Sequence, residues 1–92
     1  MDIKLLLLLH LIYSNIMITS INSLIDTIGD KPTSILCVSG GTAIRMYLKY
    51  EDDAFHIYNK IDEVWDTYTL SEFISKNKLL IKCMEKGTLM RE

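Results

Sequence analysis

The stretch TAIRMYLKYEDDAFHIYNKI, residues 42–61, decides the fold. Apolar and polar side chains alternate in residues 42–50 and again in residues 54–61. A period of two is typical of a half-buried β-strand, because successive side chains point to opposite faces. The polar residues 51–53 separate the two runs, so the sequence predicts an antiparallel hairpin with a three-residue turn. The apolar face of this hairpin is expected to consist of Ile44, Met46, Leu48, Phe55, Ile57 and Ile61.

Further strands and one helix are predicted on either side of this hairpin. Residues 34–39 are β-prone, and Gly40-Gly41 favours a turn or bulge between them and the next strand. Thr69 and Glu72 have the spacing of a capping box, which predicts a short helix through about Lys76. Residues 79–84 are predicted to form the last strand, residues 85–87 a turn, and the remaining residues a frayed end. The fold class expected from this order is mainly β (α+β).

The N-terminal segment predicts entry into the secretory pathway. Residues 5–13 are apolar apart from His10, and Ser14 and Asn15 follow them. A short polar start, an apolar segment and a small-residue exit are typical of a signal peptide. We therefore expect residues 1–20 to be a signal peptide or leader helix, cleaved after Ser14 or Ser20, and residues 21–92 to form one small β-rich domain. The expected location is outside the cell (secreted) or in the lumen of the endoplasmic reticulum.

Two other interpretations of the apolar run remain open. The run is shorter than the roughly 20 apolar residues that span a bilayer. Its extension through residues 16–25 would nevertheless give an uncleaved anchor, and the product would be a small membrane-anchored protein. Contact with a membrane is expected only in that case. In the third interpretation the run packs as a buried helix, although residues 5–12 are apolar on every side rather than along one stripe.

The short length of the chain makes cross-links or partners important for its stability. At 92 residues it is at most one domain, and a domain of that size is only marginally stable by itself. Cys37 and Cys83 can form one disulfide across a long loop, which the chain-entropy model values at roughly 3–4 kcal/mol. Two buried free thiols are the alternative. Self-association is a further expectation.

Composition and spacing argue against several kinds of chemistry. The net charge is −2 and Lys and Arg never form a run, so nucleic-acid binding has no electrostatic support. The sequence has no CxxC pair and no Cys/His cluster, and Gly40-Gly41 lacks the Walker spacing, so we expect no metal and no cofactor. His56 has no sequence neighbour that would make it a catalytic base, and we expect no enzyme activity. The carboxylates near the predicted turn and after the second strand are expected to be solvated: Asp52, Asp53, Asp62, Glu63 and Asp66.

Tyr47 and Tyr58 are the candidate binding residues. They lie on the polar faces of the two hairpin strands, where they form either a cross-strand aromatic pair or an exposed binding face. Tyr and Trp are favoured in protein interfaces because each combines a large ring with a polar tip. Trp65 is expected to lie in the core rather than in such an interface.

Two blocks of the sequence resemble the secreted poxvirus immune-evasion β-sandwich proteins. The first block covers residues 39–50, in which Ser39-Gly40-Gly41 precedes the strand IRMYL. The second covers residues 67–84, in which the helix start TLSEFI precedes LLIKC, ending at Cys83. This family includes the viral chemokine-binding proteins, the chemokine-binding domain of viral TNF receptors and their MHC-retaining relatives. The resemblance implies an immune-modulatory protein that binds a host immune protein such as a chemokine or an MHC-related ligand.

The chain departs from that family in its cysteines and its length. Family members carry cysteines about where Asp53 and Ser75 lie here, and their later strands have no counterpart in this sequence. The resemblance therefore implies a truncated member, a partial antiparallel β-sandwich with one short helix after the N-terminal apolar leader helix. Half a sandwich leaves an apolar sheet face and unpaired edges, which favour association. A truncated relative without function is the corresponding alternative.

Overall fold

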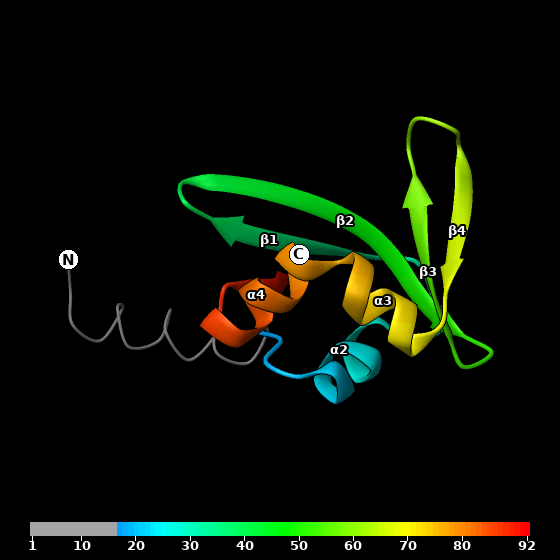
Figure 1. The fold of residues 1–92 in the computed structure, drawn as a ribbon, viewed down its shortest axis with the longest axis horizontal. Coiled ribbons are helices and arrows are strands. Elements are labelled where there is room, and N and C mark those ends of the chain that lie inside the picture. Colours follow the sequence, from blue (N-terminus) through cyan, green and yellow to red (C-terminus); the bar gives the residue numbers. More distant parts are fainter. Residues whose placement is uncertain (1–16) are drawn as a thin grey trace.

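The computed structural model describes residues 17–92, which form one antiparallel sheet and three helices (Figure 1). The strand order is β4-β3-β2-β1-β5. The fold is mainly β, of the α+β class, as the sequence predicted. In chain order the elements are α2 (Ile21–Ile28), β1 (Thr33–Ser39), β2 (Thr42–Glu51), β3 (Ala54–Asn59), β4 (Val64–Tyr68), α3 (Leu70–Lys76), α4 (Lys78–Lys86) and β5 (Leu89–Arg91).

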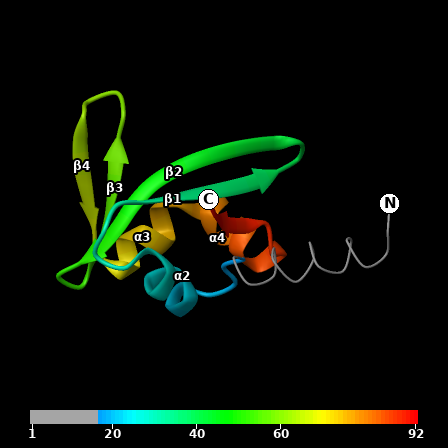
Figure 2. The same ribbon diagram turned by 180° about the vertical axis from the view of Figure 1, so that it is seen from behind.

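The three helices all pack on the same face of the sheet, which we call the inner face (Figures 1 and 2). The opposite, outer face is covered by no element of residues 17–92. The expected sandwich is therefore not confirmed, because helices rather than a second sheet cover the inner face. The expectation of a single helix is wrong, since α2 and α4 accompany the predicted α3.

The core lies between the inner face and the helices. Phe55 on β3 and Phe73 on α3 are both fully buried, and their rings stack with centroids 3.9 Å apart and an interplanar angle of 11°. The predicted capping box positions Phe73: the Glu72 N–H donates to Thr69 Oγ1 at 3.2 Å, and the Thr69 N–H donates to Glu72 Oε1 at 3.1 Å. The buried set is Ile18, Leu24, Ile28, Ile35, Cys37, Leu48, Phe55, Phe73, Leu80, Cys83, Met84 and Leu89.

The predicted hairpin is confirmed, with a shorter turn than expected. Glu51 pairs with Ala54, so only Asp52 and Asp53 form the loop, with φ of 54° and 58°. Two-residue hairpin loops with positive φ at both positions match the right-handed twist of the strands. Gly40-Gly41 forms the same kind of loop between β1 and β2, with φ of 57° and 81°.

The second hairpin strand ends earlier than predicted. β3 stops at Asn59, whose side-chain Oδ1 accepts hydrogen bonds from the N–H groups of Ile61 and Asp62 at 3.0 and 3.2 Å. These bonds turn the chain, so Ile61 lies in a loop and is 93% exposed. The expectation that Ile61 faces the core is therefore wrong. The chain returns as β4, a strand that the sequence analysis did not predict.

The largest error concerns residues 79–84, which were predicted as a strand but belong to α4. Leu80, Cys83 and Met84 are buried at positions i, i+3 and i+4, which is the spacing of one helix face. Gly87 ends the helix in the left-handed conformation with φ 72°, as glycine does more readily than other residues. The final residues are not frayed either, because β5 pairs with β1.

Helix α2 was also missed, and it begins with a serine capping box. The Ser23 N–H donates to Ser20 Oγ at 3.1 Å, while the Ser20 N–H donates to Ser23 Oγ at 3.0 Å. Leu24 and Ile28, four residues apart, face the core. Among residues 17–92 no helix is long and apolar enough to cross a membrane.

The residues before α2 join the sheet edge. The Ile18 N–H donates to the Leu89 carbonyl at 2.8 Å, Met17 bridges to Met90, and the Ile18 side chain is fully buried. Residues 1–16, most of the expected leader, lie outside the described residues. Cleavage after Ser14 would keep Ile18 in the core, whereas cleavage after Ser20 would remove it.

We therefore expect a chain that begins at Asn15 to be more stable than one that begins at Ile21. The shorter chain lacks both the buried Ile18 side chain, whose loss leaves a void worth about 2–5 kcal/mol, and the Ser20 cap of α2, worth about 1 kcal/mol. Urea unfolding of the two chains measures the difference. Thr19→Ala in the longer chain is the control, because Thr19 is exposed. Equal midpoints for the two chains would contradict this account of the sheet edge.

Candidate functional site

The candidate site is a cluster of aromatic rings on the outer face of the sheet. Tyr47 on β2 and Tyr58 on β3 both contact Trp65 on β4, with ring centroids 5.9 and 5.4 Å apart. Tyr58 and Trp65 are directly opposite each other in the β3–β4 register. We call these three rings the aromatic cluster. The structure thus brings the two candidate binding residues onto one surface, and Tyr47 is 40% exposed there.

Trp65 belongs to this cluster and not to the core, so the expectation for it is wrong. Strand β4 alternates like its neighbours: Asp66 and Tyr68 pair with Ile57 and Phe55, whose side chains point to the inner face. Trp65 must therefore point outward, where it is partly exposed. The ring of Trp65 is the point where the two tyrosines meet.

Two basic side chains border the cluster. Lys49 Nζ lies 5.2 Å from the Trp65 ring centroid, within cation–π range, and 3.2 Å from Glu51 Oε2. Arg45 donates to both carboxylate oxygens of Glu92, with Arg45 Nη2 2.6 Å from Glu92 Oε1. Lys49 was not singled out from the sequence, although the period-two pattern places it on the same face as Tyr47.

The Arg45–Glu92 ion pair lies at the border of the site and contributes little to the stability of the fold. Hydrogen bonds from Arg45, and then from Ser34 at 2.7 Å, hold the pKa of the Glu92 carboxyl below its usual range. The same pair raises the pKa of Arg45. Because both groups are solvent-accessible, the pair contributes little to the free energy of folding. It pairs Arg45 with an anion, as Glu51 does for Lys49, so both basic side chains beside the rings are ion-paired.

His56 also lies on the outer face, where both of its ring nitrogens have partners. Nδ1 is 3.1 Å from Thr67 Oγ1, and Nε2 is 3.1 Å from the Glu51 carbonyl. The carbonyl can only accept, so Nε2 is the donor in that contact, and in the neutral ring Nδ1 accepts from the Thr67 hydroxyl. The His56 imidazole therefore links the strands β2, β3 and β4.

The turn carboxylates form no metal site within residues 17–92. No group of three or more His, Cys, Asp or Glu side chains in that part of the chain could hold an ion. Asp52 and Asp53 are exposed in their loop. Asp62 and Asp66 both accept from Asn59 Nδ2, at 3.2 and 3.3 Å, which secures the loop after β3.

The two cysteines are buried, free thiols in adjacent layers, Cys37 on β1 and Cys83 on α4. Burial, together with the neighbouring Cys83 thiol, raises the pKa of Cys37 to about 11. Cys83 Sγ lies 3.6 Å from the Val38 carbonyl, and Cys37 Sγ lies 3.9 Å from Met46 Sδ. The thiols predicted as a disulfide pair are therefore neighbours, and the disulfide itself stays a prediction.

We expect the Cys37 thiol to resist alkylation in the folded protein. With a pKa of about 11, roughly one molecule in a thousand carries the thiolate at pH 8, against about a quarter for an ordinary cysteine. Iodoacetamide should label Cys37 at least a hundredfold more slowly in buffer than in guanidinium, as measured by mass spectrometry. Equal rates would contradict the burial. A chain that is labelled in guanidinium only after reduction would contain the predicted disulfide.

No protein-family model, curated protein or solved structure matches the chain. The resemblance to the poxvirus immune-evasion proteins therefore stays a prediction. The case for a function depends on the residues of the outer face.

Proposed function

We propose that this chain is a non-enzymatic, immune-modulatory binding protein of a virus, and that it contacts its partner through the aromatic cluster. The partner is a host immune protein such as a chemokine or an MHC-related ligand. The observation that carries the proposal is the position of the cluster, on a sheet face that none of the elements within residues 17–92 covers. The two blocks of family resemblance supply the class of partner.

The cluster has the properties of a binding hot spot. Trp and Tyr are enriched among the residues that dominate binding energy. The cross-strand contacts to Trp65 already order the rings, so binding would cost little further side-chain entropy. Lys49 over the Trp65 ring adds a charged group at the edge, where polar rims of interfaces normally lie.

The expected leader indicates in which compartment the protein would meet its partner. A cleaved leader would deliver the domain into the endoplasmic reticulum and out of the cell, where the proposed partners are found. The alternative is a membrane-anchored protein with an uncleaved leader, and one observation favours it over cleavage after Ser20: Ile18, within residues 1–20, is built into the sheet edge. Mass spectrometry of the N-terminus separates the two. A start at Asn15 or Ile21 supports export, and an intact Met1 on a carbonate-resistant protein supports the anchor.

We expect Tyr47→Ala to weaken binding about tenfold or more, because hot-spot aromatics typically contribute at least 2 kcal/mol. Trp65 is the only tryptophan, so its fluorescence reports directly on the site. The purified chain is titrated with individual chemokines and with MHC class I.

Two variants serve as controls for this experiment. Tyr47→Phe keeps the ring and should bind nearly as the parent does. Leu70→Ala alters an exposed side chain on the helical layer and should leave binding unchanged. A well-folded parent that binds none of these proteins, or that binds equally well without the Tyr47 ring, would overturn the proposal.

A further inference from the structure

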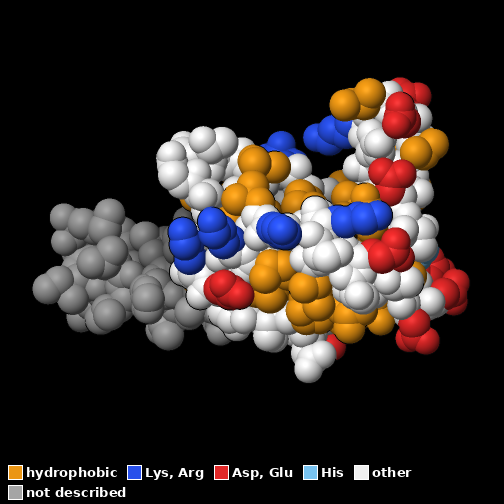
Figure 3. Space-filling view, viewed as in Figure 1, with side chains coloured by type: hydrophobic (Ala, Val, Ile, Leu, Met, Phe, Trp, Pro, Cys, Tyr) orange, Lys and Arg blue, Asp and Glu red, His pale blue; other side chains and the backbone are white. Residues whose placement is uncertain are grey.

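A groove lies on the helical layer, away from the aromatic cluster. It has a volume of about 380 Å³ and is lined by Ile74, Lys78, Leu79, Ile81, Lys82 and Glu85. Ile74 and Leu79 are 42% and 41% exposed, which is high for large apolar side chains. On the face made by α3 and α4, apolar side chains gather beside a row of basic ones (Figure 3). The groove is thus apolar, with a charged border on which Lys78 and Lys82 outnumber the single carboxylate of Glu85.

The loop between β3 and β4, residues 60–63, combines an exposed apolar side chain with a net negative charge, because Asp62 and Glu63 outnumber Lys60. Ile61 is 93% exposed at its tip, and Asp62 and Glu63 follow it directly. The β3–β4 hairpin projects from the body of the molecule and presents this loop at its far end (Figure 1). Hydrogen bonds to Asn59 hold Ile61 and Asp62 in place. We call residues 60–63 the tip.

We propose that the tip of one copy of this chain docks into the groove of a second copy. Ile61 would enter the apolar part of the groove, and the carboxylates of Asp62 and Glu63 would face the ammonium groups of Lys78 and Lys82. None of the ion pairs within residues 17–92 involves Lys78, Lys82 or Glu63.

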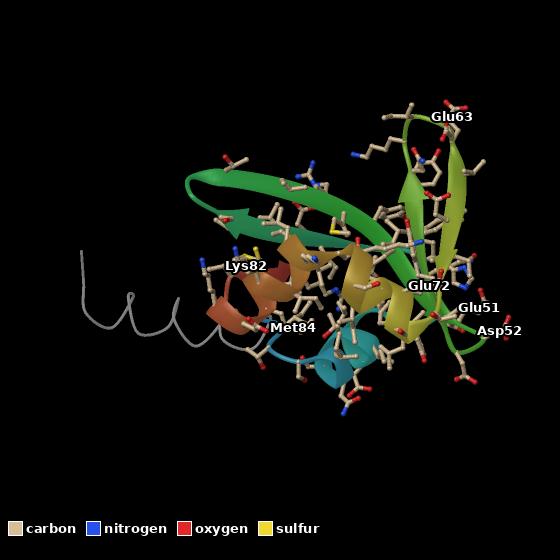
Figure 4. All side chains as sticks on the ribbon, viewed as in Figure 1. Glu51, Asp52, Glu63, Glu72, Lys82 and Met84 are labelled. Atoms are coloured by element: carbon tan, nitrogen blue, oxygen red, sulfur yellow. The ribbon has the colours of Figure 1, made fainter. Side chains whose placement is uncertain are left out.

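The contact must be made between copies, not within one. Glu63 at the tip and Lys82 on α4 lie on opposite sides of the molecule, and the hairpin points away from the helices (Figure 4). Each copy carries one tip and one groove, so the contact is heterologous and each copy can engage two neighbours. A small interface of this kind gives a weak complex.

Two substitutions at exposed positions separate the two halves of the contact. Ile61→Asp destroys the tip and keeps the groove, whereas Leu79→Asp destroys the groove and keeps the tip. Sedimentation of the full chain up to about 1 mM should show a mass that rises with concentration. Each variant alone should sediment as a monomer, and their mixture should form a one-to-one complex that grows no further. Circular dichroism confirms that both variants are folded.

Charge reversal tests the ionic part of the contact. Lys82→Glu should weaken association at least tenfold, and the double variant Lys82→Glu/Glu63→Lys, in which only the swapped charges can meet, should restore it. Lys31→Glu, at an exposed position away from the groove, is the matched control and should change nothing. A parent chain that remains monomeric, association that survives both Ile61→Asp and Leu79→Asp, or a mixture that fails to associate would each overturn the proposal. None of these outcomes depends on whether the aromatic cluster binds an immune protein.

Discussion

Phe55 and Phe73 hold the two layers of this small protein together. Their stacked, fully buried rings join the strand β3 to the helix α3, and the Tyr50 ring packs edge-on against Phe55 at 4.8 Å. The helix α4 is positioned relative to this contact, because it follows α3 after a single residue. The helices cover the inner face of the sheet, and the aromatic cluster lies on the outer face. The same packing therefore creates both the core and the candidate binding surface.

The parts of the fold that the sequence predicts are those specified by local patterns. The alternation through residues 42–59, the Gly40-Gly41 loop and the Thr69–Glu72 capping box each act over a few residues, and all three are present. Residues 79–84 are different, because a short apolar run fits a buried strand as well as a helix. Packing against β1 and the Gly87 cap favour the helix α4 over a strand for these residues. The strand β4 was not predicted because the charged Asp66 interrupts the run of strand-forming residues in this segment.

The candidate site could also be predicted only in part, because local patterns place some of its residues and tertiary packing places the others. The period of two places Tyr47, Tyr58 and Lys49 on one face, and that placement is confirmed by their shared contact with Trp65. The position of Trp65 depends on β4 and on the loop that Asn59 organises, neither of which could be predicted from sequence spacing. The aromatic cluster thus consists of Tyr47 and Tyr58, which the sequence pattern identifies, and of Trp65, whose position depends on the tertiary structure.

The edge of the sheet also bears on how the chain folds during its synthesis. The hairpins β1–β2, β2–β3 and β3–β4 join neighbouring segments, so each can form as soon as it leaves the ribosome. Ile18, by contrast, is hydrogen-bonded to Leu89, about 70 residues later in the sequence. This contact can form only after the segment around Leu89 has been made, and long-range pairing of this kind is slow to form. Until then Ile18 remains uncovered, and nascent chains at that stage would be the natural substrates of a chaperone.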